Sequence, residues 1–151
     1  MKVTRPTEGA ARPRVDSVER ALEQVSDRWS FLLLREAYFG LRRFDQFQSA
    51  LGTSPNILTD RLKKLVAVGI FERYRYSERP PRDEYRLTDK GRDLYPAIVA
   101  LMRWGDRWLN DASEPPLTLI HTSCGSDCRP RMVCDCCGEE ITARSMAWRA
   151  R

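Results

Sequence analysis

The stretch from Arg43 to Gly69 most constrains the fold, because it has the pattern of two short helices joined by a tight turn. Apolar residues recur at helical spacing in its first part, and Gly52 then ends the first helix. Ser54 is a favourable N-cap, and Pro55 at the first helical position removes a backbone N–H that has no partner there. The pattern therefore predicts a second helix over 54–68.

This second helix has two different faces. Its apolar face carries Leu58, Leu62, Leu65 and Val66, and its other face carries Asn56, Thr59, Asp60, Lys63 and Ala67. A short helix, a turn and a polar-faced second helix form the helix-turn-helix arrangement, which places the second helix in a DNA major groove. An ordinary pair of core helices has the same pattern, so this window alone leaves both interpretations open.

A β-hairpin over 71–87 is predicted directly after this helix. Tyrosines alternate with charged residues in two short runs, and we expect the segment 77–83, SERPPRD, to form the turn. Its two prolines do not fit inside a sheet and so belong at the hairpin tip, where Arg79 and Arg82 flank them. A basic-tipped hairpin after a polar-faced helix is a wing, which favours DNA binding more than the helices alone.

Two helices are predicted before this region. The first begins near Asp16, which forms a variant of the capping box with Glu19. The chain breaks near Asp27 and continues into WSFLLLREAYFG, which is apolar almost all round. We expect this segment to form a buried central helix that Gly40 ends.

A last helix is predicted over 89–110, with Thr88 as its cap. It has two apolar stripes, the first made of Leu94, Ile98, Leu101, Gly105 and Trp108 and the second of Tyr95, Val99, Met102 and Leu109. Because this arc is wider than docking on one small domain requires, we expect the second stripe to form a subunit interface. Pro96 falls near the first turn, where it is tolerated, or it kinks the helix.

The composition fits this organisation. A chain of 151 residues that is 42% hydrophobic can build one domain and a small appendage, and no stretch approaches the roughly 18 apolar residues of a membrane span. Residues 1–14 are basic, lack periodicity and are predicted to be a disordered arm. Without an apolar export signal the expected location is the cytoplasm. The net charge of +5 concentrates in this arm and in residues 42–93, which weakly supports a polyanionic partner.

Four segments together resemble the HxlR-type transcriptional regulators, winged-helix relatives of the MarR group. They are VERALEQVSDRWSFLLLRE, RRFDQFQSALGTSPNILTDRLKKLVAVGIFER, PPRDEYRLTDKG and ALMRWGDRW, and they cover residues 18–109 nearly without a gap. The resemblance implies a cytoplasmic prokaryotic homodimer that binds operator DNA and represses or activates a nearby gene. Many relatives carry a cysteine just before the first helix that some use as a redox switch; here Asp16-Ser17 stands there, so that design is not expected.

The resemblance also implies which residues contact DNA. Candidate groove contacts are Ser54, Asn56, Thr59, Arg61 and Lys63, and candidate wing contacts are Arg79 and Arg82. A two-fold protein presents two such helices, which predicts a pseudo-palindromic operator. A small-molecule or redox effector is a possible further partner that the residues do not identify.

A cysteine-rich tail follows a helix-breaking SEPP segment at 113–116. Two β-type runs, LTLIH and RPRMV, lead into the pairs His121-x-x-Cys124 and Cys134-x-x-Cys137. Tetrahedral Zn²⁺ takes four nitrogen or sulfur ligands, which two such pairs can supply. Reduced metal-free cysteines and disulfides among Cys134, Cys136 and Cys137 remain the alternatives. Five cysteines, an odd number, in a chain without an export signal argue against a disulfide framework.

The sequence thus predicts a mainly α fold with a small amount of β (α+β). Its parts are the arm at 1–14, a winged helix-turn-helix domain at 15–112, a zinc-ribbon-like hairpin at 117–142 and a tail at 143–151. The primary function predicted is a dimeric DNA-binding regulator, and no catalytic constellation suggests an enzyme. The alternative is a winged-helix protein-interaction module with a zinc-bound or redox-sensing tail, which should show an aromatic anchor on its recognition helix.

Overall fold

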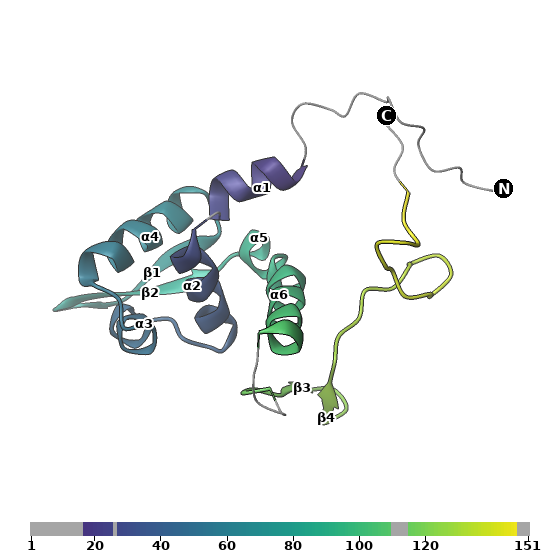
Figure 1. Cartoon of the computed structure of the whole chain (residues 1–151). Helices are drawn as coiled ribbons and strands as arrows, with labels where there is room; N and C mark the ends of the chain where they lie inside the picture. Colours follow the sequence, from purple (N-terminus) through teal and green to yellow (C-terminus); the bar gives the residue numbers. More distant parts are fainter. Residues whose placement is uncertain (1–16, 26, 110–114, 148–151) are drawn as a thin grey trace. The chain divides into compact units, whose positions relative to one another are not determined.

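The computed structural model describes residues 17–25, 27–109 and 115–147, which fall into two separate units (Figure 1). The first contains α1 (Ser17–Val25), α2 (Arg28–Tyr38), α3 (Phe44–Leu51), α4 (Pro55–Ala67), β1 (Phe71–Glu78), β2 (Pro81–Leu87), α5 (Asp89–Arg92) and α6 (Tyr95–Trp108). The second contains β3 (Leu119–His121) and β4 (Ser126–Cys128). The predicted α+β fold class is confirmed. The predicted arm at 1–14 lies outside the described residues.

Helix α2 lies at the centre of the first unit, as its apolar sequence predicts. Leu33 and Leu34 are completely buried, and they pack with Phe47 of α3 and Phe71 of β1, whose rings are 6.3 Å apart. The other core residues are Val25, Leu58, Leu62, Leu65, Ile70 and Ile98. No helix of the described residues is both long and apolar enough to cross a membrane.

The strands β1 and β2 form an antiparallel hairpin that leaves the helices directly after α4 (Figure 1). Pairing continues to Glu78 opposite Pro81, so the turn consists of Arg79 and Pro80 alone. The predicted turn over 77–83 was therefore too long. Pro81 fits because it is the first residue of its strand, where a missing backbone N–H is tolerated.

Thr88 and Gly91 join the base of this hairpin to the end of α4. The Thr88 backbone N–H donates to the Ile70 carbonyl, and its hydroxyl donates to the Gly69 carbonyl. Gly91 packs so closely here that a Cβ atom would lie 2.3 Å from the Ile70 carbonyl oxygen. The Tyr38 hydroxyl donates to the Gly91 carbonyl, so α2 and α5 meet at this glycine, beside Ile70 in the connection between α4 and β1.

The helix predicted over 89–110 is two helices, and Asn110 lies outside the described residues. Thr88 caps α5 as predicted, because its hydroxyl accepts a hydrogen bond from Gly91. The chain then turns before α6, which has Pro96 in its first turn. A continuous helix would need an N–H at Pro96 to bond the carbonyl four residues earlier, and proline has none.

The prediction of which stripe of this helix stays exposed was right for Tyr95 and Leu109 and wrong for Val99 and Met102. Val99 is buried and Met102 packs against the core, although both belong to the stripe expected at a subunit interface. The exposed large apolar residues here are Leu101, Trp104 and Trp108, each more than half exposed, together with Tyr95 at the start of α6 and Leu109 just after it. Their spacing of three and four residues places the first three on one side of the helix.

The tail unit contains a small hairpin in which β3 pairs with β4. LTLIH forms a strand in part, as predicted, but the second strand is Ser126–Cys128 and not RPRMV. In the RPRMV run only Val133 forms a bridge, to Glu140. Pro130 lacks the N–H that a strand ladder needs, which accounts for the absence of a continuous strand there.

Candidate nucleic-acid interface and cysteine-rich turns

The turn between α3 and α4 has the local geometry that its sequence predicts. Gly52 adopts a left-handed conformation, with φ of +59°, and ends α3. Ser54 caps α4, since its hydroxyl accepts a hydrogen bond from the Ile57 backbone N–H at 3.4 Å. Pro55 occupies the first turn of α4. The helix-turn-helix is thus fixed by local interactions as well as by its core contacts.

The faces of α4 also follow the prediction. Leu58, Leu62 and Leu65 are buried in the core. The exposed residues of α4 are Pro55, Asn56, Ile57, Asp60, Lys63 and Ala67. Thr59 is half-buried at the edge of this face. The exposed face carries no aromatic side chain.

Arg61 and Lys64, on the flank of α4, lie against the N-terminus of α2. The Arg61 Nε atom is 3.4 Å from one carboxylate oxygen of Asp27, and the Lys64 Nζ atom is 3.7 Å from the other. Asp27 caps α2 by accepting hydrogen bonds from the Ser30 backbone N–H and hydroxyl. Arg61 and Asp27 are close enough to form an ion pair, but the Arg61 Nε atom does not have the geometry of a hydrogen bond to the carboxylate.

Several causes act on the pKa of Asp27. Burial raises the pKa, but the two hydrogen bonds from Ser30 and the charges of Arg61 and Lys64 together lower it by more. The net pKa is therefore below the ordinary value of 3.8. Sequence reasoning missed this cluster, although an acidic residue directly before an apolar helix is a recognisable N-cap signal.

Most arginines of the wing are paired within it. Arg73 and Arg75 both lie beside Asp83, at 3.4 and 3.1 Å, and Arg86 and Arg43 lie beside Glu84, at 3.1 and 3.6 Å. The two pairs with Asp83 join β1 to β2 and so stabilise the register of the hairpin, whereas Arg86 shares β2 with Glu84 and Arg43 precedes α3. By contrast, within the part of the chain that the structure describes, Arg79 and Arg82 at the tip have no ion-pair partner.

An open polar pocket of about 490 Å³ lies between the start of α3 and the wing. The Arg43 guanidinium covers the Tyr76 ring there, 4.7 Å from its centroid, and Arg82 lines the same pocket. The sequence did not single out Arg43, because its approach to Tyr76 depends on how the hairpin packs against α3.

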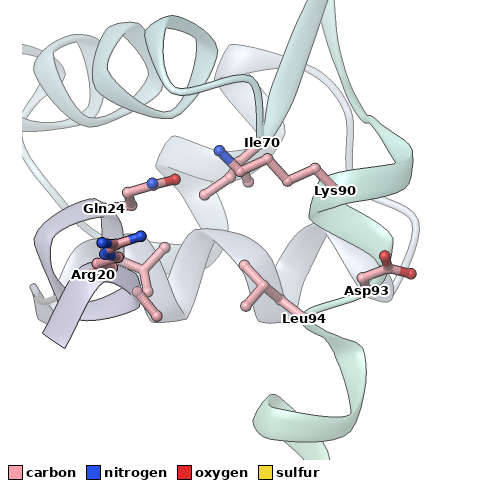
Figure 2. Close-up of a pocket in the computed structure, with 8 residues that line it drawn as sticks. Arg20, Gln24, Ile70, Lys90, Asp93 and Leu94 are labelled. Carbon is pink, nitrogen blue, oxygen red and sulfur yellow. The ribbon is translucent and has the colours of Figure 1, made fainter. Parts of the chain in front are cut away.

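Two pockets lie beside α1. One of about 260 Å³ is lined by Arg20 and Gln24 of α1 and by Lys90, Asp93 and Leu94, as Figure 2 shows. The other, about 250 Å³, is lined mostly by apolar side chains of α1, α2 and α6. Both cavities have room for a small molecule.

The two cysteine-containing turns of the tail have closely similar backbones. The Gly125 N–H donates to the His121 carbonyl at 2.8 Å, and the Gly138 N–H donates to the Cys134 carbonyl at 2.8 Å. Both glycines have positive φ, +69° and +74°, which glycine adopts without strain. In each turn a backbone hydrogen bond thus connects the first predicted ligand, His121 or Cys134, to the glycine four residues later.

Backbone N–H groups also point at two of the sulfur atoms. Hydrogen bonds from the Ser126 backbone lower the pKa of the Cys124 thiol. Those from the Cys137 and Cys136 backbones lower the pKa of the Cys134 thiol. In both turns this arrangement favours the thiolate, which is the form that binds metal ions.

The structure brings the four predicted zinc ligands together only as two pairs. The Cys124 Sγ atom lies 3.4 Å from the His121 Nδ1 atom, and Cys134 and Cys137 share the second turn. Among the described residues no three His, Cys, Asp or Glu side chains form a group that could hold a metal ion. The four-ligand site stays a prediction, and all five cysteines are free thiols.

Comparison with known proteins identifies the family. Residues 24–113 match the HxlR-like helix-turn-helix family. An uncharacterised HTH-type transcriptional regulator of Mycobacterium tuberculosis (strain ATCC 25618 / H37Rv) is 53% identical over 131 residues, which are 87% of this chain and 83% of the relative. Because that alignment is longer than the family match, the likeness extends beyond the helix-turn-helix domain.

Solved structures agree. The protein PA1607, named as a candidate transcription factor, is 34% identical to this chain and superposes on it with a TM-score of 0.81. The alignment covers 91% of this chain and 96% of PA1607. The redox regulator HypR in its reduced form is 32% identical with a TM-score of 0.58, covering 62% of this chain and 96% of its own. None of these three relatives is named as an enzyme. The chain belongs to the HxlR-like family of helix-turn-helix transcriptional regulators.

Proposed function

We propose that the protein is a homodimeric regulator that binds a pseudo-palindromic DNA operator in the cytoplasm. In each half-site α4 lies in the major groove and the wing lies against the flanking backbone. The observation that carries this proposal is the exposed face of α4, which presents Asn56, Asp60 and Lys63, lacks an aromatic anchor and follows a turn closed by Gly52 and Ser54. A protein-binding face would be expected to present aromatic side chains.

The proposal assigns two kinds of contact. Ser54, Asn56, Thr59 and Lys63 are the candidates for the groove, and Arg79 and Arg82 for phosphates. Phosphate contacts set the position of a protein on DNA, while contacts with base edges determine sequence preference. Arg61 as a groove contact stays a prediction, and its Nε atom lies beside Asp27 instead.

The two copies are proposed to meet through α6. Leu101, Trp104 and Trp108 form an apolar surface on this helix that the described chain leaves exposed. Soluble proteins cover most contiguous apolar surface of this kind, and a second copy of α6 offers a matching one. A small-molecule effector or a redox effector would act on this dimer. The two pockets beside α1 have room for a small molecule.

The test is a binding titration of the full-length protein with DNA fragments from its own promoter and with scrambled duplexes of the same composition. Footprinting first locates the protected sequence. We expect protection of two half-sites whose centres are about one helical turn, or a small multiple, apart. Equal affinity for the two duplexes at physiological salt would reject the regulator proposal in favour of the protein-interaction alternative.

A further inference from the structure

The tail unit lacks an apolar core. None of its described residues, 115–147, is buried, and its two strands have three residues each. Units of this size need another source of stability, usually disulfides or a metal ion, because apolar burial cannot offset the entropy of ordering the chain. The tail contains five cysteines and one histidine, which are ligand types that Zn²⁺ takes, and this composition points to a metal ion as that source.

The first turn already has the spacing of two zinc ligands. With a Zn–S distance of about 2.3 Å and a Zn–N distance of about 2.0–2.1 Å, a tetrahedral angle separates sulfur and nitrogen by roughly 3.5 Å. The Cys124 Sγ atom is 3.4 Å from the His121 Nδ1 atom. These two atoms can therefore bind one ion with little movement.

The second turn repeats the first in its backbone. Aligned on their glycines, Cys134 and Cys137 take the positions of His121 and Cys124, and the carbonyl-to-glycine hydrogen bond has the same length in both. Cys136 then takes the position of Ser123, which is not a ligand in the first turn. The repetition thus selects Cys134 and Cys137 and leaves Cys136 out.

We propose that His121, Cys124, Cys134 and Cys137 together bind one structural Zn²⁺ ion. In the described residues the two turns form no joint group, so the ion itself brings them together. The eight residues from Ser126 to Val133 span at most about 26–29 Å when extended, which leaves ample length for a return path. Three thiols lose their protons on binding, and the closed site has no open position for water.

The experiment is a titration of the reduced full-length protein with Co²⁺, whose visible absorption reports tetrahedral thiolate coordination, followed by displacement with Zn²⁺. We expect one ion per chain. Cys124→Ser, Cys137→Ser and His121→Ala should each weaken binding by more than roughly tenfold, which is the loss that even an outer-shell change causes. Elemental analysis of protein produced in zinc-replete medium gives an independent count of bound metal.

Two cysteine variants provide matched controls. Cys136→Ser and Cys128→Ser also remove one sulfur from the tail, but the proposal predicts that they keep one ion per chain and the same absorption. Less than a tenth of an equivalent of metal in the reduced wild type would overturn the proposal. So would a loss in Cys136→Ser as large as that in Cys137→Ser. DNA affinity is measured in parallel. Because the winged helix has its own core, failure of the zinc proposal would leave the DNA-binding proposal intact, and the reverse also holds.

Discussion

Arg61 of α4 and Asp27 at the N-terminus of α2 are in contact, with 3.4 Å between the Arg61 Nε atom and a carboxylate oxygen of Asp27. The same carboxylate caps α2 through Ser30. One acidic side chain therefore both begins the central helix and fixes the flank of the helix proposed to enter the DNA groove.

Two substitutions at Asp27 separate these roles. Asp27→Ala removes the cap and should lower the free energy of unfolding by about 0.5–2 kcal/mol, whereas asparagine can still cap. Asp27→Asn should therefore cost less in urea denaturation at pH 7. A loss in Asp27→Asn equal to that in Asp27→Ala would show that the charge, and not the cap, is the main contribution.

The pH dependence tests the charge directly. The pKa of Asp27 is lowered in the folded protein, so its charge adds stability above the ordinary pKa of 3.8 that it has in the unfolded chain. That stability is lost as pH falls through the lower folded pKa. The difference in unfolding free energy between wild type and Asp27→Asn should thus be constant above about pH 5 and shrink below about pH 4. A difference independent of pH would contradict the prediction.

Asn56 is expected to determine sequence preference. Its side chain is exposed near the start of α4, and an amide can bond an adenine edge through two hydrogen bonds. Asn56→Ala should weaken binding to the operator by about 1–3 kcal/mol and relax the preference at one base pair in each half-site. Competition binding with operators substituted at single positions measures this. A loss spread evenly over all sequences would instead assign Asn56 to the backbone.

Arg82 is expected to behave differently, because an interaction with phosphate carries no sequence information. Arg82→Ala should weaken binding to operator and scrambled DNA alike. The slope of log K against log salt should become less steep by about one unit for each phosphate that the arginine neutralises. Arg73→Ala is the matched control on the same hairpin: its charge is paired with Asp83, so the slope should change less. Equal changes in the two variants would argue against a special role for the tip.

The proposed dimer predicts that α6 is sensitive to charge. Trp104→Asp places a carboxylate in the exposed apolar surface and should weaken association by at least about tenfold, or roughly 1.4 kcal/mol. Ile120→Asp changes a similarly exposed residue in the tail unit and serves as the control. Sedimentation across micromolar concentrations measures both. A wild type found only as a 17.5 kDa species would reject the dimer itself.

Local signals in the sequence predicted the helix-turn-helix well, because Gly52, Ser54 and Pro55 act on their own backbone neighbours. The same holds for Thr88 as a cap. The length of the wing turn was predicted less well: how far the strands pair depends on cross-strand contacts such as Arg75 with Asp83, which no single run displays.

Tertiary contacts explain the rest. The sequence shows two apolar stripes on α6, but which one is covered depends on the direction from which α2 packs against it. The approach of Asp27 to Arg61 joins residues 34 positions apart, and neither has a local pattern that points to the other. In the tail, the sequence spacing of His121 with Cys124 and of Cys134 with Cys137 predicted the ligand pairs. The similarity of the two turns is seen only in their backbone hydrogen bonds and φ angles.

The close packing at Gly91 limits how such a regulator can diversify. Exposed positions on α4 and at the wing tip are free to change, so operator preference can drift by single substitutions. The placement of the wing beside α4 cannot drift in this way, because any side chain at Gly91 meets the Ile70 carbonyl where the helix passes into the strand. Under the proposed mode of binding, descendants of this chain would readily acquire new base preferences but would keep the same distance between groove and flank contacts.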